Sequence, residues 1–172
     1  MSTYVKIETI DVGSGGGYPI VFSSIPNKYT DLLVKLSLRT TSGLATEQLY
    51  MTFNGSTSGY SCRQLYGTGS GTAADTLSNS GAAISIININ TGSHTANVFS
   101  STDICIPNYL SSEYKSVSAE SVTENNGTNA LAGLTAGLWS NTAAITSISF
   151  GNQDGSNFVQ YSSATLYGIK KN

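Results

Sequence analysis

Apolar and polar residues alternate along most of this chain, which is the period of a β-strand whose successive side chains point to opposite faces. The clearest run covers Thr30 to Arg39, where the even-numbered positions from Leu32 to Leu38 are all apolar. This run predicts a strand with one face in a core and one face in water. A second run, Glu47 to Phe53, ends at Asn54-Gly55, a pair typical of a type I′ β-hairpin.

Further strands are predicted near residues 63–66, 84–89, 95–106, 114–122, 134–139, 144–150 and 158–169. The apolar positions of 84–89 change phase between Ile86 and Ile87, which indicates either a bulge or a strand buried on both faces. Leu134, Ala136 and Leu138 alternate towards Trp139. We expect the strand at 158–169 to be central, and residues 67–81 to form a long exposed loop.

About ten strands and no helix predict an all-β fold, with residues 1–172 forming one domain. The long connections at 67–81 and 107–113 fit Greek-key crossings between sheets better than a simple meander. We therefore predict an antiparallel β-sandwich that is jelly-roll-like.

Charged residues make up 10% of the chain and the formal net charge is −2. Ordinary soluble domains carry about 25% charged residues. Ser, Thr, Gly and Asn fill the difference, and they favour strands and turns over helix interiors. The eight Lys and Arg residues form no basic patch, which argues against a nucleic-acid partner. A weakly charged surface favours close packing against copies of itself or against a shell.

The chain contains no apolar run of membrane-spanning length, and its first residues do not resemble a secretory signal. We therefore expect no membrane partner and synthesis in a cytoplasm. Cys62 and Cys105 lie outside any Cys-x-x-Cys spacing, and we interpret them as buried free thiols, with a disulfide as the alternative.

Candidate catalytic groups are few. His94 is the single histidine and lies in a predicted loop without the motifs that accompany a nucleophile, so we interpret it as a surface histidine instead of a catalytic base. Glu120 and Glu124 are too far apart along a strand, roughly 13 Å at ~3.3 Å per residue, for a glycosidase pair unless the chain turns between them. We expect no enzyme activity.

Two loops resemble ligand-binding loops in part. Residues 13–17 are rich in glycine, but no Lys-Ser/Thr pair follows, so a flexible hairpin is predicted there. Residues 152–157 place oxygen-bearing side chains at alternating positions, as calcium loops do, but they lack the terminal Glu, and we interpret them as an ordinary turn. No cofactor or metal site is predicted.

Tyrosine is the remaining candidate for recognition, because an aromatic ring with a polar tip suits contacts with sugars and proteins. The alternative is that these rings pack at sheet edges. Five of them lie near predicted loops or strand ends and are our candidate partner-binding residues: Tyr18, Tyr60, Tyr66, Tyr109 and Tyr114.

Five segments together resemble a family of small structural proteins of tailed bacteriophages, many of them from cyanobacterial and marine hosts. The segments are FSSIPNKYTDL at 22–32, IPNY at 106–109, AESVTENNG at 119–127, AGLWSNTAAITSI at 136–148, and FVQY with ATLYGI within 158–169. The likeness covers nearly the whole chain. It implies a virion component, either a capsid decoration (cement) protein or a tail-fibre-like protein.

We favour the capsid, because the predicted sandwich begins within a few residues of Met1 and leaves no room for an attachment shaft. The resemblance then implies a homotrimer on the outer capsid surface that binds the major capsid protein and stabilises contacts between capsomers. Low charge and abundant Tyr, Ser and Thr suit such symmetric contacts. The alternatives are a tail-fibre adhesin that recognises host surface glycans and a hydrolase that acts on such glycans.

Overall fold

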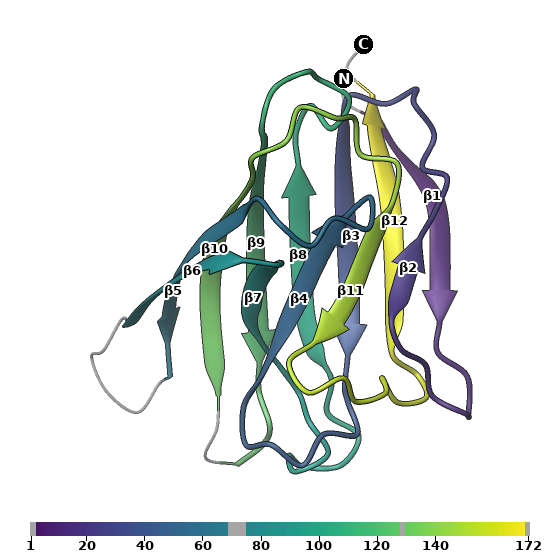
Figure 1. The fold of residues 1–172 in the computed structure, drawn as a ribbon. Coiled ribbons are helices and arrows are strands. Elements are labelled where there is room, and N and C mark those ends of the chain that lie inside the picture. The colour runs from purple at the N-terminus through teal and green to yellow at the C-terminus, as the bar shows by residue number, and fades with distance from the viewer. Residues whose placement is uncertain (1–2, 69–74, 128–129, 171–172) are drawn as a thin grey trace.

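The computed structural model describes residues 3–68, 75–127 and 130–170, and the regular elements within them are all β-strands (Figure 1). This confirms the all-β prediction. The strands are β1 (Thr3–Asp11), β2 (Ile20–Phe22), β3 (Asp31–Leu38), β4 (Glu47–Phe53), β5 (Tyr60–Gly67), β6 (Asp75–Gly81), β7 (Ile84–Ile89), β8 (Ser100–Ile106), β9 (Lys115–Thr123), β10 (Leu131–Trp139), β11 (Ile148–Asn152) and β12 (Ser163–Lys170).

The strands form two antiparallel sheets that pack face to face. The larger sheet has the order β1-β12-β3-β8-β9-β10-β5-β6, and the smaller has the order β2-β11-β4-β7. Their pairing is nested along the chain: β1 pairs with β12, β2 with β11, β3 with β8, and β4 with β7. This nesting is the arrangement of a jelly roll, in which one long folded ribbon is wrapped into two sheets, and it confirms the predicted sandwich.

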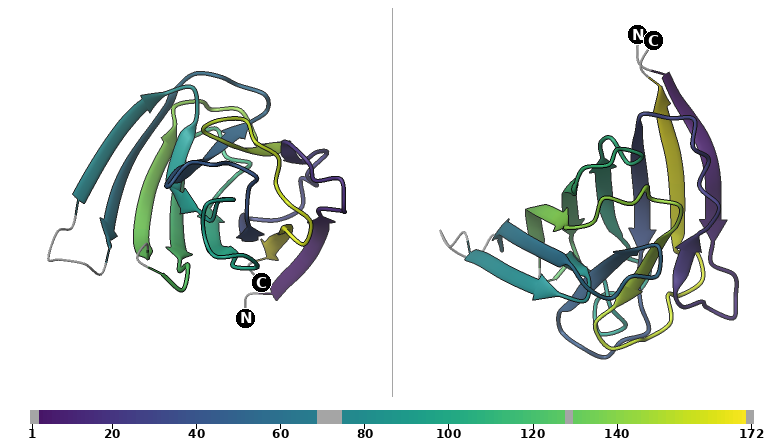
Figure 2. Two further views of the ribbon diagram at one scale, coloured as in Figure 1. Left: turned by 90° about the horizontal axis from the view of Figure 1, so that it is seen from below. Right: turned by 45° about the horizontal axis from the view of Figure 1, so that its top comes forward.

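Four strands are added to this jelly roll and lie in the larger sheet. The hairpin β5–β6 is inserted between β4 and β7, and β9 and β10 are inserted between β8 and β11. As a result the larger sheet is twice as wide as the smaller one, and the β5–β6 hairpin projects beyond the smaller sheet at one side of the molecule (Figure 2).

The two connections predicted to cross between sheets differ in outcome: the chain does pass from β5 in the larger sheet to β7 in the smaller sheet, but only after residue 81, whereas residues 107–113 stay within the larger sheet. Residues 75–81, predicted as part of a long loop, form the edge strand β6, which pairs with β5. An edge strand is held by backbone hydrogen bonds on one side, so it does not need the apolar alternation by which strands are recognised. Residues 107–113 join β8 to β9, which are neighbours in the same sheet. Other crossings are made by connections such as residues 39–46 between β3 and β4 and residues 90–99 between β7 and β8.

The turns at 54–55 and 13–17 occur where the sequence predicts them, but neither joins two strands that pair with each other. Asn54 and Gly55 both have positive φ, 52° and 68°, and the Ser56 amide donates to the Phe53 carbonyl at 2.9 Å, as the motif predicts. The strands on either side, β4 and β5, nevertheless belong to different sheets. The glycine-rich segment 13–17 likewise connects β1 and β2 across the sandwich, so the hairpin predicted there is wrong.

Other strand predictions are confirmed. β3 and β4 lie where the alternation placed them. β12, predicted to be central, is an interior strand but lies second from the edge of the larger sheet, between β1 and β3. Both alternatives predicted from the phase change of β7, a bulge and burial on both faces, are present. Its register against β4 shifts between Glu47 and Leu49, which marks a bulge, and Ile86 and Ile87 are both buried.

The core lies between the two sheets and is rich in aromatic rings. Trp139 of β10 packs on Phe53 of β4 with ring centroids 5.5 Å apart, and on Tyr60 of β5 at 6.1 Å. Phe22 and Phe150 meet edge to face on the smaller sheet. The two sheets therefore share one continuous hydrophobic core.

Candidate functional site

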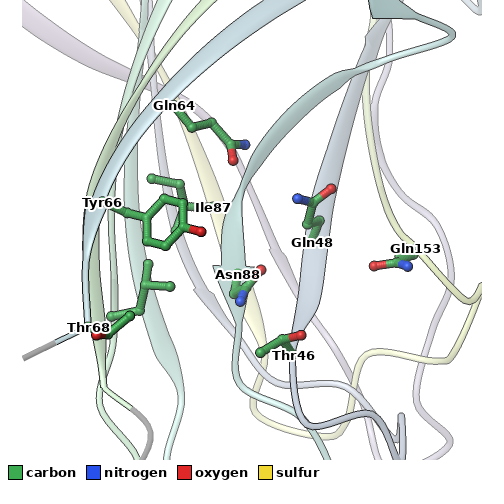
Figure 3. A pocket seen from close by; sticks show the side chains of 9 residues that line it. Thr46, Gln48, Gln64, Tyr66, Thr68, Ile87, Asn88 and Gln153 are labelled. Atoms are coloured by element: carbon green, nitrogen blue, oxygen red, sulfur yellow. The ribbon is translucent and has the colours of Figure 1, made fainter. Parts of the chain in front are cut away.

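The overhanging part of the larger sheet and the smaller sheet enclose a groove of about 490 Å³ (Figure 3). Tyr66 and Gln64 come from β5, Gln48 from β4 and Asn88 from β7, while Gln153 follows the end of β11. Figure 3 shows the Tyr66 ring standing on one side of this space with the amides of Gln48 and Asn88 across from it. The site therefore combines one aromatic ring with four carboxamides.

Hydrogen bonds hold two of the four amides of this groove, those of Gln64 and Gln48, in place. The Gln64 side chain is buried, and its Nε2 donates to the Ser85 carbonyl at 2.7 Å. The Ser85 hydroxyl donates in turn to Oε1 of Gln48 at 2.7 Å. Buried amides fixed in this way present their remaining polar atoms in defined directions.

The groove is lined mainly by uncharged polar side chains. Among the described residues that line it there is no Asp, Glu, His, Lys, Arg or Cys. Carboxamides and hydroxyls, added by Thr46 and Thr68, offer donors and acceptors for an uncharged polar ligand, and a tyrosine ring offers an apolar face. Such a lining suits sugars better than anions or metal ions.

The structure separates the five tyrosines predicted as a partner-binding set. Tyr60 and Tyr109 are buried, so their assignment to a binding surface is wrong. The Tyr60 hydroxyl accepts the Phe53 N–H at 2.7 Å, and the Tyr109 hydroxyl donates to the Pro26 carbonyl. Both rings sit near loops, as predicted, but they secure those loops from the core side.

The other three tyrosines reach the surface at different places. Tyr66 lines the groove. Tyr18 is 43% exposed and stacks on Phe158, and Tyr114 is 59% exposed beside the start of β9. They come from separate connections and strands, and no pocket described in the structure brings them together.

His94 has a structural role. Its Nδ1 accepts the Thr91 N–H at 3.3 Å, so its Nε2 carries the proton and donates to the Ala45 carbonyl at 3.0 Å. The ring thus ties the loop after β7 to the loop before β4. Both ring nitrogens are engaged with backbone, and the imidazole is half-buried instead of lying free on the surface as predicted.

Two buried cations also hold loops. The Arg39 guanidinium donates to the carbonyls of His94, Thr95 and Val98 at 2.8–3.1 Å. The Lys115 ammonium donates to the carbonyls of Ser111 and Glu113, and burial lowers the pKa of both cations. They donate hydrogen bonds to loop carbonyls that would otherwise be buried without a partner.

The two cysteines are free thiols. Cys62 is buried on the inner face of β5, as predicted, whereas Cys105 is partly buried and lies opposite Leu33 on the outer face of β8. Two strands, β9 and β10, separate β8 from β5. At about 4.8 Å per strand this spacing is too wide for a disulfide, which excludes the alternative.

The carboxylates considered for catalysis do not form a pair across a cleft. Glu120 lies on the outer face of β9, and the Glu124 carboxylate accepts the Asn126 N–H at 2.7 Å in the turn after that strand. Within the described residues no group of three or more His, Cys, Asp and Glu side chains could hold a metal ion.

A second surface feature lies on the outer face of the larger sheet. Leu65, Val122 and Leu134 are 50%, 43% and 55% exposed. Leu134 lies directly opposite Leu65, and Ala132, two residues before it, lies opposite Val122. These four residues, which we call the outer patch, are apolar neighbours on the outer face of β9, β10 and β5, with the exposed Glu120 beside them, directly opposite Leu134.

No protein-family model matches the chain, and no curated protein matches it significantly in sequence. Within the residues that the structure describes, none forms a helix suited to crossing a membrane.

Proposed function

We propose that this protein is a non-enzymatic structural protein of a tailed-bacteriophage virion. In this proposal it is a capsid decoration protein that binds the major capsid protein on the outer surface as a homotrimer and stabilises contacts between capsomers. The five segments that resemble small phage structural proteins support the virion assignment, and the low charge of the chain favours close packing with neighbours.

The observation that carries this proposal is the outer patch. Leucine and valine side chains half exposed on a flat sheet are costly in water, at about 25 cal/mol per Å² of apolar surface, and this cost is removed when a neighbouring molecule covers them. The patch lies on rigid paired strands, so little ordering entropy is lost on association. We assign it to contacts between copies of the chain, because a symmetric assembly repeats the same contact in every copy.

Particle binding tests the proposal. Purified protein should co-sediment with capsids of the encoding phage from which it has been stripped, and labelled protein on intact particles should decorate the capsid shell. Label confined to the tail, or no association with either structure, would contradict the capsid assignment.

The groove supports a second candidate, a receptor-binding adhesin that recognises host surface glycans. Its four carboxamides and Tyr66 match the hydroxyl groups and apolar faces of a sugar. Binding of the isolated protein to a glycan array would support the adhesin, provided that Tyr66→Ala abolishes the signal and Tyr161→Ala, which changes a tyrosine outside the groove, preserves it. Absence of binding to any glycan would count against this candidate.

A further inference from the structure

A buried carboxyl group and an exposed one meet at the end of the sandwich opposite the two termini, where β4 begins and β11 ends (Figure 1). Glu47 is the first residue of β4, and Asp154 lies in the loop that follows β11. The Asp154 N–H donates to Oε1 of Glu47 at 3.4 Å, and the two carboxyl side chains are hydrogen-bonded to each other. Glu47 has no surface exposed to solvent. It lies 107 residues from Asp154 in the sequence.

Oxygen-bearing side chains surround this pair. The Thr40 hydroxyl donates to Oε2 of Glu47 at 2.6 Å, and the Ser42 side chain is hydrogen-bonded to Asp154. The Ser156 N–H donates to Oδ1 of Asp154 at 2.9 Å, and its hydroxyl donates to the same atom. Each hydroxyl oxygen retains a lone pair after donating its proton.

An independent observation comes from Asn152, which is 3% exposed. Its Nδ2 donates to the Ser156 carbonyl at 2.7 Å, but its Oδ1 is buried and accepts no hydrogen bond. Exchanging the two ends of the amide would place Oδ1 against the Ser156 carbonyl, so the orientation is determined.

The unpartnered oxygen belongs to a residue that neighbours the carboxyl pair. Asn152 lies opposite Leu49 in the β11–β4 register, and Glu47 comes two residues before Leu49 on the same inner face. Asn152 and Glu47 are therefore diagonal neighbours across the two strands, within reach of long side chains. The loop that holds the amide nitrogen is also the one that carries Asp154.

Two ionised carboxyl groups in contact repel each other, so a positive charge, either a proton or a cation, must lie between them. A proton on Glu47, whose pKa burial raises to about 7, would relieve the repulsion with Asp154 but would leave Oδ1 of Asn152 without a partner. A divalent cation would satisfy all three groups at once. Ca²⁺ prefers such mixed sets of carboxylate, amide and hydroxyl oxygens, whereas Mg²⁺ retains most of its water.

We propose that Glu47, Asn152 and Asp154 form a Ca²⁺-binding site, with Thr40, Ser42 and water completing the coordination. The loop at 152–157 lacks the terminal Glu of a calcium loop, and Glu47 supplies that carboxylate from a neighbouring strand. Such an ion would fix the loop after β11 to β4. This inference does not depend on the proposed virion role.

Calcium titration of the full chain tests this site. Protein stripped with EDTA and held at pH 7.5 should bind Ca²⁺ with saturation in calorimetry, and its melting temperature should rise by about 3 °C or more once Ca²⁺ is tenfold above its dissociation constant. Glu47→Gln and Asp154→Asn should each weaken binding at least tenfold. Asp103→Asn, which changes an exposed carboxylate on the outer face of the larger sheet, should leave the calcium affinity unchanged.

Two results would overturn the proposal. One is wild-type protein with no calcium-dependent heat or melting shift, which would assign the pair to a shared proton. The other is a calcium response that persists undiminished in Asp154→Asn, which would place the ion elsewhere. Asp154 lies near the surface, so this variant should fold even if Glu47→Gln does not.

Discussion

The two faces of β10 differ in burial, and the sequence pattern of this strand predicts the wrong face for the core. The inner face carries Gly133, Thr135, Gly137 and Trp139, and the outer face carries the more apolar set of Ala132, Leu134, Ala136 and Leu138. The alternation of the leucines would normally predict that their side enters the core. Instead Leu134 is 55% exposed and Trp139 is buried.

The reason is the close approach of β7. A Cβ added to Gly133 would lie 2.1 Å from Cδ1 of Ile87, and one added to Gly137 would lie 2.8 Å from Cγ2 of Ile84. The isoleucines of β7 thus fill the space that side chains of β10 would need, and glycine is required there. The partner sheet therefore decides which face of this strand is buried. The leucines left outside are available to a neighbouring molecule.

The largest stability effect is expected on the inner face at Trp139. Trp139→Ala removes a ring packed between Phe53 and Tyr60 and should lower the free energy of unfolding by about 3–5 kcal/mol. Urea unfolding measures this loss. Tyr161→Ala, at a tyrosine that is 76% exposed, should change it by less than about 0.5 kcal/mol. Equal losses in the two variants would contradict the assigned core.

Overpacking of the same face should come next. Gly133→Ala places a methyl group 2.8 Å from the Leu65 carbonyl, which belongs to the backbone and cannot move aside cheaply. The expected loss is about 1–3 kcal/mol in the same unfolding experiment. Gly67→Ala is the matched control in the neighbouring strand, because no atom lies within 4 Å of the added Cβ. A tolerated Gly133→Ala would contradict the close approach of the Leu65 carbonyl and Ile87 to Gly133.

A smaller effect is expected for the Tyr60 hydroxyl, which fastens the turn after β4. Tyr60→Phe keeps the ring in the core but leaves the Phe53 N–H without its 2.7 Å acceptor. The loss should be about 1–2 kcal/mol. Hydrogen exchange of the Phe53 amide should accelerate by more than the global loss of stability accounts for. Unchanged protection of that amide would show that the hydroxyl does not hold it.

Local patterns predicted the strands that lie over the core. β3 and β4 have a strict alternation because one face of each is buried, and the phase change of β7 marked its bulge correctly. Turn chemistry was also readable, since the positive φ of Asn54 and Gly55 is a local property. Which strands these turns join is decided by long-range pairing, and the sequence pattern does not contain it.

The candidate sites were harder to predict for the same reason. The amides of the groove come from β4, β5, β7 and the loop after β11, and each looks like an ordinary polar strand residue when considered alone. Glu47 and Asp154 become neighbours only through the β4–β11 pairing. Tyrosine near predicted loops was an informative signal for Tyr66, but it did not distinguish exposed rings from the buried Tyr60 and Tyr109.

The outer face of β10 should show the smallest stability effect and the largest effect on assembly. Leu134→Glu places a charge in the outer patch, where the side chain is already half exposed. Because Glu120 lies directly opposite on β9, the variant should lower the free energy of unfolding by no more than about 1 kcal/mol. The same charge would be desolvated in any contact between copies, which is strongly unfavourable.

Light scattering of wild-type protein and Leu134→Glu side by side tests whether the outer patch joins copies of the chain. We expect a wild-type particle of three times the 17.9 kDa chain mass and a folded monomer for the variant, with Tyr161→Ala as a control that assembles normally. A wild-type monomer at high concentration, or a variant that assembles as the wild type does, would contradict this role of the outer patch.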